Sequence, residues 1–237
     1  TLVGENIISS GGILIQAMPD CSEELLDALE IRAELFSSIS QLLSEMTLEE
    51  IVATARERGL DAVCITDHDS MGLKETAERY SRETGFPIFV GVEYFSLWGD
   101  ITAFGIDRFP DKRIPAQDFV DQVNAAGGFC VACHPFRNNN RGFEDHLWEI
   151  QGLHGVEVLN GSTDMEANRK ALSICKARNM QMVGASDAHW TSQLGKYATM
   201  VPGEPKDLEE FVAALHKGGL KPAIYEEGKG YRIGDTF

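Results

Sequence analysis

Acidic, imidazole and amide side chains recur where short apolar runs of the sequence end. They are Asp67 and His68, Glu93, His134, Asn160, and Asp187 with His189. In parallel α/β barrels the carboxyl ends of the strands meet on one face, so we expect these side chains to surround one centre. Imidazole and carboxylate groups are ligands of Zn, Mn and Fe, and a pair of such ions polarises a phosphoryl oxygen and activates water. The spacing therefore predicts a divalent metal centre.

Strand and helix signals alternate around these residues. We expect strands at 62–66, 87–92, 101–106, 129–133, 156–159, 182–185 and 220–225. We expect helices after the capping box of Thr47 and Glu50, and at 72–84, 115–126, 143–150, 164–178 and 207–217. Such alternation predicts a mainly parallel sheet, and about seven units in one chain favour a closed or nearly closed barrel. His154 precedes its strand, which places it on the opposite face.

The first 46 residues carry a different pattern. Residues 12–18 have the composition of a strand, and residues 20–45 show an apolar stripe typical of one long helix. This helix either packs on the domain or mediates homo-oligomerisation. We expect residues 1–237 to form a single domain, with 1–46 as a divergent addition and 47–225 as its core.

Composition limits the partners of this chain. Its formal net charge of −16 disfavours duplex nucleic acid and anionic membranes. No apolar run approaches the roughly 20 residues that a membrane span needs. Five cysteines form an odd set, which predicts reduced thiols and a cytoplasmic location. An anionic substrate would require bound cations that reverse the local field.

Several motifs resemble one known family. They are Thr-Asp-His-Asp at 66–69, Gly-Val-Glu at 91–93, Ala-Cys-His-Pro-Phe at 132–136, Gly-Val-Glu-Val-Leu-Asn at 155–160 and Ser-Asp-Ala-His at 186–189. In this order they resemble the PHP domain (polymerase and histidinol phosphatase) over roughly residues 47–225. The resemblance implies a distorted, TIM-like (β/α)7 barrel, phosphoesterase activity and up to three divalent ions. It also implies metal ligands at His68, Glu93, His134, Asp187 and His189.

The start of the chain departs from the family pattern. The family opens with a strand that ends in His-x-His, but this sequence has no histidine before His68. One alignment places Phe36 and Ser38 at the two positions, and another places Gln16 and Met18 there, with Asp20 as a further ligand. Neither alignment restores the pair. We therefore expect one to three sites for Zn, Mn or Fe, held with fewer ligands than in the family.

The remaining polar residues suggest how a substrate is held. Arg137 and Arg141 follow His134 closely and either grip a phosphate or belong to a solvated loop. Asn160 falls where the family has a ligand or a polar residue near the site, and Asp67 is a candidate for ligand orientation or proton transfer. Together, the five predicted ligands and the resemblance predict hydrolysis of a small phosphomonoester or nucleotide ester through metal-bound hydroxide. The alternatives are a degenerate PHP-like module with a binding or assembly role and, less well supported, an amidohydrolase-type barrel.

Overall fold

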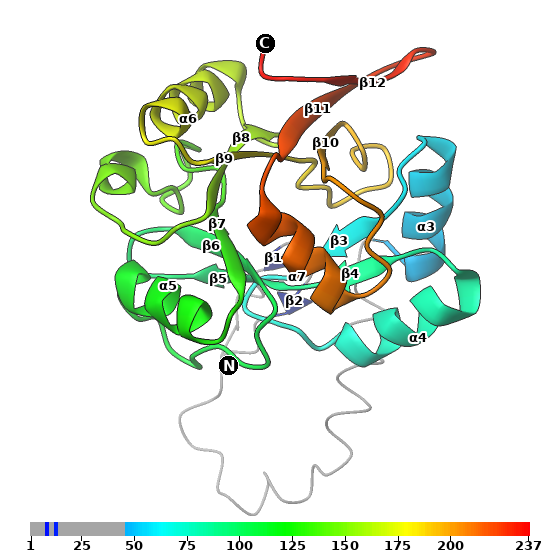
Figure 1. The fold of residues 1–237 in the computed structure, drawn as a ribbon, viewed down its shortest axis with the longest axis horizontal. Helices are drawn as coiled ribbons and strands as arrows, with labels where there is room; N and C mark the ends of the chain where they lie inside the picture. Colours follow the sequence, from blue (N-terminus) through cyan, green and yellow to red (C-terminus); the bar gives the residue numbers. More distant parts are fainter. Residues whose placement is uncertain (1–7, 10–11, 14–45) are drawn as a thin grey trace, which may run out of the picture.

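The computed structural model describes residues 46–237, together with the short strands β1 (Ile8–Ser9) and β2 (Gly12–Ile13), which pair in antiparallel fashion. The expected helix at 20–45 and the positions Gln16, Met18, Asp20, Phe36 and Ser38 lie outside the described residues. Helices α3, α4, α5 and α6 lie around the central strands, and α7 crosses in front of them in Figure 1. The architecture is therefore mixed α/β.

The parallel part of the fold follows the expected alternation. Strand β3 (Val63–Ile65) pairs with β4 (Ile88–Val90), while β7 (Phe129–Ala132), β8 (Gly155–Asn160) and β9 (Gln181–Ala185) form a parallel run. The helices are α3 (Leu48–Glu57), α4 (Lys74–Thr84), α5 (Ala116–Ala125), α6 (Met165–Ala177) and α7 (Leu208–Lys217). The predictions for these elements are confirmed.

The prediction of a mainly parallel sheet is wrong, because antiparallel pairs join its parts. The expected strand at 87–92 divides into β4 and β5 (Val92–Phe95), and β5 pairs in antiparallel fashion with β6 (Asp100–Phe104). Strand β6 is also antiparallel to β7. Strands β10 (Tyr197–Met200), β11 (Lys221–Glu226) and β12 (Gly230–Ile233) form a separate antiparallel sheet.

A closed barrel is not found among the described residues, since their strands fall into separate sheets. Strands β10 and β12 had no counterpart among the expected elements. The segment expected as a helix at 143–150 forms the 3-10 helix η1 (Glu144–Trp148) instead. In that segment Glu144 has a φ of 49°, a left-handed conformation that an α-helix does not accommodate.

Local sequence explains where the helices begin and end. The capping box before α3 is present: the Glu50 N–H donates to Thr47 Oγ1 at 3.2 Å, and the Thr47 N–H donates to Glu50 Oε2 at 2.8 Å. Helix α4 ends at Gly85, whose φ of 66° suits a residue without a Cβ atom. Helix α6 begins at Asp164, which accepts the Ala167 N–H.

Three apolar clusters hold the helices on the strands. The largest joins β5 to β8 with α5 and α6, and it includes Phe119 and Val156. The second lies between α3, α4 and the β3–β4 pair, and the third packs α7 through Phe211 against Phe89 and Phe129. Cys130, Cys133 and Cys175 are buried free thiols, as expected, whereas Cys64 is exposed. No helix in the described part of the chain combines the length and apolarity that a membrane crossing requires.

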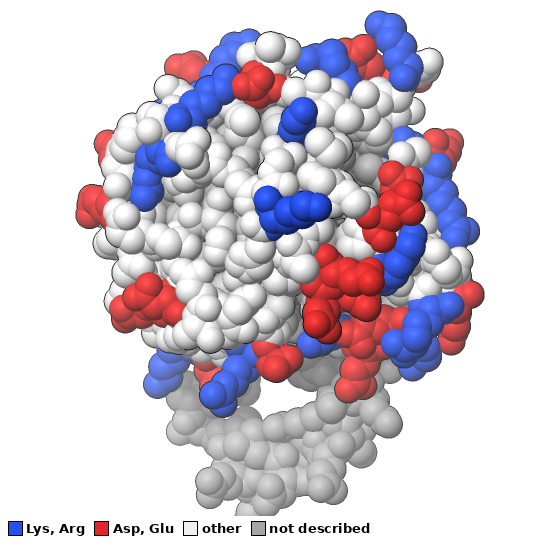
Figure 2. All heavy atoms as spheres, in the orientation of Figure 1, with Lys and Arg blue, Asp and Glu red and all other residues white. Residues whose placement is uncertain are grey.

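Charge is unevenly distributed over the face drawn in Figure 2. Much of its middle is uncharged, and side chains of both signs lie around it.

Candidate metal centre

Three buried side chains converge at the edge where β5, β6 and β7 meet. Glu93 lies within β5, Asp100 opens β6, and His134 follows β7. Each offers one ligand atom, and these atoms all lie within 4.8 Å of one another. His134 Nε2 is 3.2 Å from Glu93 Oε1 and 3.6 Å from Asp100 Oδ2. Glu93 and His134 were predicted ligands, whereas Asp100 was not.

The hydrogen bonding of His134 tests whether this trio suits a cation. Its Nδ1 atom is buried and has no hydrogen-bond partner, while its Nε2 atom faces two carboxylates. Without a bound cation, a proton on Nδ1 leaves an unpaired donor and requires a protonated carboxyl group opposite the Nε2 lone pair; a proton on Nε2 leaves Nδ1 an unpaired acceptor. A divalent cation among the three side chains would reconcile that lone pair with the carboxylates. Imidazole nitrogen and carboxylate oxygen are suitable donors, so the residues fit a metal.

His68 joins this trio through an extension of β3. The Glu93 N–H donates to the Asp67 carbonyl at 3.1 Å, and the Asp69 N–H donates to the Glu93 carbonyl at 2.9 Å. This pairing brings His68 Nδ1 to 3.4 Å from Glu93 Oε1. The predicted proximity of these two side chains is therefore present.

The loop after β9 carries the other two predicted ligands. Asp187 Oδ2 accepts a hydrogen bond from Asn160 Nδ2 at 3.2 Å, and His189 Nδ1 is 3.9 Å from Asp187 Oδ1. His134 and Asp187 both have positive φ, 25° and 48°, which is uncommon outside glycine and frequent at functional sites. In the described part of the chain, no second trio of His, Cys or acidic side chains converges as closely as the first.

A buried glutamate connects the two groups of side chains. Glu157 Oε2 accepts the His134 N–H at 2.9 Å and the Asn160 Nδ2 hydrogen at 3.0 Å. Asn160 in turn donates to Asp187. Glu157 was not predicted, although a single charged residue inside an otherwise apolar, buried strand is a signal that could have identified it.

Both predicted phosphate-binding arginines contact acidic side chains of the centre. Arg141 donates from Nε and Nη2 to the two Asp100 oxygens at 2.7 and 2.8 Å, and its Nη2 lies 3.0 Å from His68 Nδ1. Arg137 Nη2 donates to Asp187 Oδ2 and, at 2.6 Å, to Asn160 Oδ1. The two arginine side chains are therefore tied to the centre, whereas residues 138–140 between them are exposed, as the solvated-loop alternative expected.

Burial shifts the protonation of most groups in this cluster toward their neutral forms. It raises the pKa of Glu93 to about 8, of Asp100 and Glu157 to about 7, and of Asp67 to about 6. Burial, followed by the charge of Arg141, lowers the pKa of His68 to about 4. Burial acts to raise the pKa of Asp187, but the charge and hydrogen bond of Arg137 outweigh it and lower that pKa. Such a concentration of perturbed groups is typical of functional sites.

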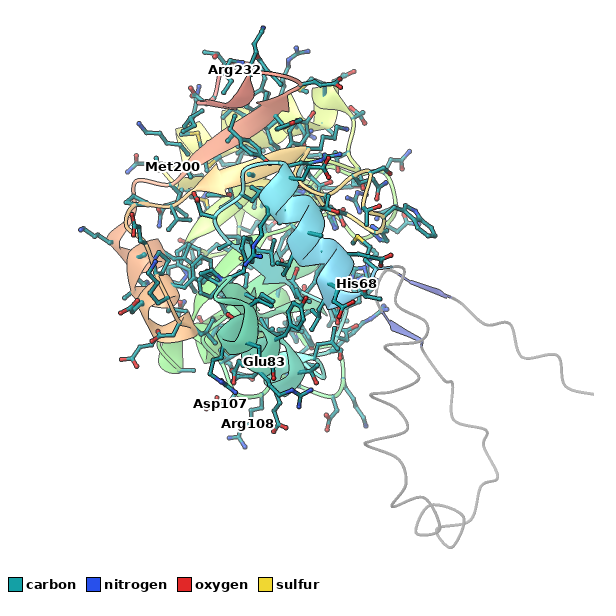
Figure 3. All side chains as sticks on the ribbon, turned by 90° about the vertical axis from the view of Figure 1, so that its right-hand side faces the viewer. His68, Glu83, Asp107, Arg108, Met200 and Arg232 are labelled. Carbon is teal, nitrogen blue, oxygen red and sulfur yellow. The ribbon has the colours of Figure 1, made fainter. Side chains whose placement is uncertain are left out.

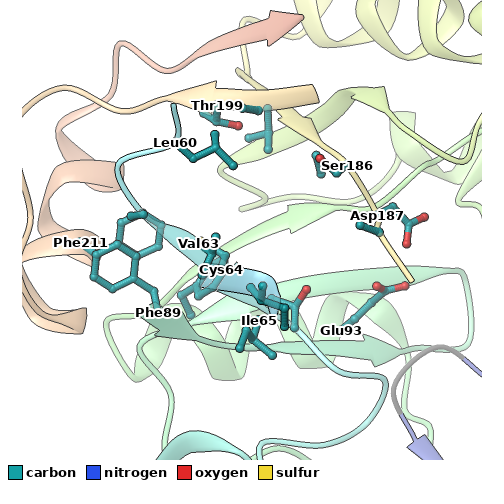
Figure 4. Close-up of a pocket in the computed structure, with 18 of the residues that line it drawn as sticks. Leu60, Val63, Cys64, Ile65, Phe89, Glu93, Ser186, Asp187, Thr199 and Phe211 are labelled. Atoms are coloured by element: carbon teal, nitrogen blue, oxygen red, sulfur yellow. The ribbon is translucent and has the colours of Figure 1, made fainter. Parts of the chain in front are cut away.

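A cavity of about 2000 Å³ opens beside the centre. His68 and Met200 both line it and lie on opposite sides of the molecule in Figure 3. Figure 4 shows Glu93 and Asp187 at one end of the cavity and Phe89 with Phe211 at the other. These two rings stack with centroids 4.2 Å apart. One end of the cavity is therefore acidic and the other apolar.

Solved structures of low sequence identity share this fold. A proposed metal-dependent phosphoesterase from Bifidobacterium adolescentis superposes with a TM-score of 0.54 at 18% identity, covering 74% of this chain and 92% of that one. An amidohydrolase from Chromobacterium violaceum gives 0.53 at 18%, covering 70% and 90%. A lesion-specific endonuclease from Pyrococcus furiosus gives 0.54 at 16%, covering 75% of this chain and 53% of that one.

Sequence comparison agrees with the fold. An uncharacterized protein of Methanocaldococcus jannaschii is 24% identical over 110 residues, which cover 46% of this chain and 64% of that protein. The match therefore spans less than two thirds of its length. The PHP-associated family matches residues 165–220, and the PHP domain family matches residues 35–158. Since the second match alone covers more than half of the chain, this protein belongs to the PHP domain family.

Proposed function

We propose that this protein is a metal-dependent hydrolase, and more narrowly a phosphoesterase that acts on a small phosphomonoester or nucleotide ester. The observation that carries the proposal is the convergence of Glu93, Asp100 and His134 beside an open cavity. The Bifidobacterium neighbour, a proposed metal-dependent phosphoesterase, supports the same reaction class.

Glu93, Asp100 and His134 would hold one divalent cation, and His68, Asp187 and His189 would contribute to further sites. Bound cations would polarise the phosphoryl group and activate water for attack on phosphorus. Glu157 fixes the backbone of His134, and so acts as a positioning residue. Asp67 has the same role toward Glu93, because its carbonyl accepts the Glu93 N–H.

Arg137, Arg141 and Asn160 would orient the substrate at the rim of this centre. Guanidinium groups bind phosphate oxygens through paired N–H donors, and both arginines lie within reach of the acidic end. The leaving group would extend toward Phe89 and Phe211, where the cavity is apolar. The volume of the cavity, about 2000 Å³, exceeds the roughly 300–1,000 Å³ of a typical ligand pocket, which leaves room for a nucleoside-sized group.

Hydrolysis of p-nitrophenyl phosphate and of mononucleotides, measured on the full chain with added Mn²⁺ or Zn²⁺, tests this proposal. Glu93→Gln should abolish turnover and metal binding. Glu83→Gln is the matched control, because Glu83 is exposed on α4 and is not among the residues that line the cavity. The proposal fails if wild-type protein with bound metal hydrolyses no phosphoester, or if both variants retain equal activity.

A module without catalysis is the second candidate. The observation that favours it is that Arg137 and Arg141 already compensate acidic side chains of the centre. Substitution of His134 and Asp187 by alanine would then leave its binding role intact. Under this candidate, residues 20–45 would mediate homo-oligomerisation, which light scattering on the full chain can test. The choice among Zn, Mn and Fe, and the cytoplasmic location, remain predictions.

A further inference from the structure

One loop carries two arginines that contact different side chains of the acidic centre. Arg137 and Arg141 both lie between β7 and η1, four residues apart in sequence. Arg141 contacts Asp100 and His68, whereas Arg137 contacts Asp187 and Asn160. Each of these two groups of side chains is therefore paired with its own arginine.

The contacts of Arg141 use atoms that a metal would need. It forms a two-pronged hydrogen bond to both oxygens of Asp100, whose side chain is 0% exposed. Its Nη2 also lies 3.0 Å from His68 Nδ1, the atom that faces Glu93. The guanidinium lies over the Phe95 ring at 4.2 Å, which fixes its plane. Arg141 thus places a positive charge among ligand atoms of the centre.

Arg137 makes the corresponding contacts with the other group of side chains. Its Nη2 donates to Asp187 Oδ2, and its Nε donates to Thr163 Oγ1 at 3.1 Å. The side chains of Arg137 and Asp187 are only 18% and 13% exposed, so solvent screens this ion pair weakly. A cation that binds Asp187 must therefore displace Arg137 or tolerate its charge.

We propose that Arg137 and Arg141 compete with divalent cations for the side chains of this centre, and that metal binding releases both guanidiniums to the substrate phosphate. The inference rests on the proposed function. Like charges repel strongly at short range in a buried site, and a guanidinium and a cation cannot share one lone pair. By linkage, a substitution that removes the guanidinium group and leaves its carboxylate in place tightens metal binding.

If the arginines instead hold the metal ligands in place, the predicted change in metal affinity has the opposite sign. If Arg141 only holds Asp100 in a ligating orientation, its loss would weaken metal binding, as loss of an outer-shell partner does. If Arg141 competes with the metal, its loss would tighten binding. The sign of the change in Mn²⁺ affinity therefore separates the two roles.

The experiment measures Mn²⁺ dissociation constants of chelator-treated full-length protein by calorimetry and by the electron paramagnetic resonance signal of free Mn²⁺. Arg141→Gln and Arg137→Gln should each bind Mn²⁺ at least about fivefold more tightly than wild type, the lower end of typical coupling between sites. Arg141→Lys keeps the charge but loses the two-pronged geometry, so its affinity should fall between those of wild type and Arg141→Gln.

Arg113→Gln is the matched control. Arg113 lies over the Phe95 ring at 3.6 Å, as Arg141 does at 4.2 Å, but it forms no ion pair with any residue that the structure describes. Its removal changes the net charge equally and should leave the affinity unchanged. Equal tightening in Arg113→Gln would show a general charge effect, and unchanged or weaker binding in the Arg137 and Arg141 variants would exclude competition.

Two safeguards keep the test decisive. If Arg141→Gln does not fold because Asp100 is left buried and unpaired, Arg137→Gln and Arg141→Lys decide the outcome. The metal-binding result is also independent of turnover. Absence of hydrolysis in metal-loaded protein would refute the proposed function and leave the competition standing, whereas weaker binding in the variants would refute the competition alone.

Discussion

His134 and His154 lie at opposite ends of neighbouring strands and have very different surroundings. His134 follows β7 and faces Glu93 and Asp100. His154 precedes β8; its Nδ1 accepts the Cys130 N–H at 3.1 Å, and its ring stacks on Phe129 at 4.7 Å. Both lie beside buried strands, but only the histidine at the carboxyl end meets carboxylates. The end of the strand, rather than the residue type, decides which partners a histidine acquires.

The direction of the pKa shift is the same for both histidines. Burial lowers the pKa of His134 and also that of His154. The direction of the shift therefore does not distinguish a candidate ligand from a packing residue. The convergence of carboxylates does, because only His134 belongs to a trio whose ligand atoms lie within 4.8 Å of one another.

Paired substitutions at the two ends test this distinction with the largest expected effect. His134→Gln should lose Mn²⁺ binding and phosphoester hydrolysis by more than the roughly 10–100-fold that loss of an outer-shell partner costs. His154→Gln keeps a side-chain acceptor near the Cys130 N–H and should change neither quantity. Equal losses in both variants, measured by calorimetry and initial rates, would contradict the assignment of the site to one end.

Asp100→Asn should produce the next largest effect. It removes a negative charge from the trio and an ion-pair partner from Arg141, while it preserves the shape of the side chain. We expect Mn²⁺ affinity to fall by roughly 10–100-fold. Thr102→Val, two residues further along β6, is the control for changes in that strand, because the hydrogen bond of Thr102 Oγ1 goes to the Cys133 thiol, which is not a member of the trio. Unchanged affinity in Asp100→Asn would remove Asp100 from the centre.

Asp100 also shows why the sequence identified the centre incompletely. The prediction assumed parallel strands and therefore searched after each apolar run. Strand β6 is antiparallel to β5 and β7, so its first residue lies at the same edge as the carboxyl ends of the other strands. His68, Glu93 and His134 were predicted because each follows an apolar run. Asp100 was missed because it opens its strand, and the direction of a strand in the sheet is set by its tertiary contacts.

The helices were easier to predict than the sheet, for a related reason. The capping box of Thr47 and Glu50 and the terminal Gly85 are local signals, and the structure contains both. The division of residues 87–92 into β4 and β5 depends instead on different partners, β3 and β6. The sequence likewise placed Arg137 and Arg141 beside the centre but did not reveal that both contact acidic side chains there.

The buried carboxyl groups of the centre should make the metal-free protein less stable as the pH rises from about 6.5 to 8. Burial raises the pKa of Glu93 to about 8 and those of Asp100 and Glu157 to about 7. In this range the folded state holds protons that the unfolded state has lost, so the free energy of unfolding falls as the pH rises. His68 and His134, whose pKa values are lowered, oppose this trend only below about pH 6.5.

Thermal unfolding in the presence of a chelator measures this trend. The Tm should drop by about 2–4 °C for each kcal/mol lost. Added Mn²⁺ should raise the Tm more at pH 8 than at pH 6.5, because metal ligands must be deprotonated. Glu93→Gln removes the most strongly shifted of these carboxylates and should flatten the dependence. An equally steep decline in that variant would assign the effect to groups elsewhere.

The smallest effect is expected from substitutions of His154, at the amino ends of the strands. His154→Phe keeps an aromatic ring against Phe129 but leaves the buried Cys130 N–H without its acceptor. We expect the free energy of unfolding to fall by about 1–3 kcal/mol, as measured by urea denaturation, because a buried donor loses its partner. His154→Gln, which can still accept, should lose less. Neither variant should alter Mn²⁺ affinity, because His154 packs against Phe129 and His216 at the amino ends of the strands. A changed affinity would mean that these ends are coupled to the metal centre.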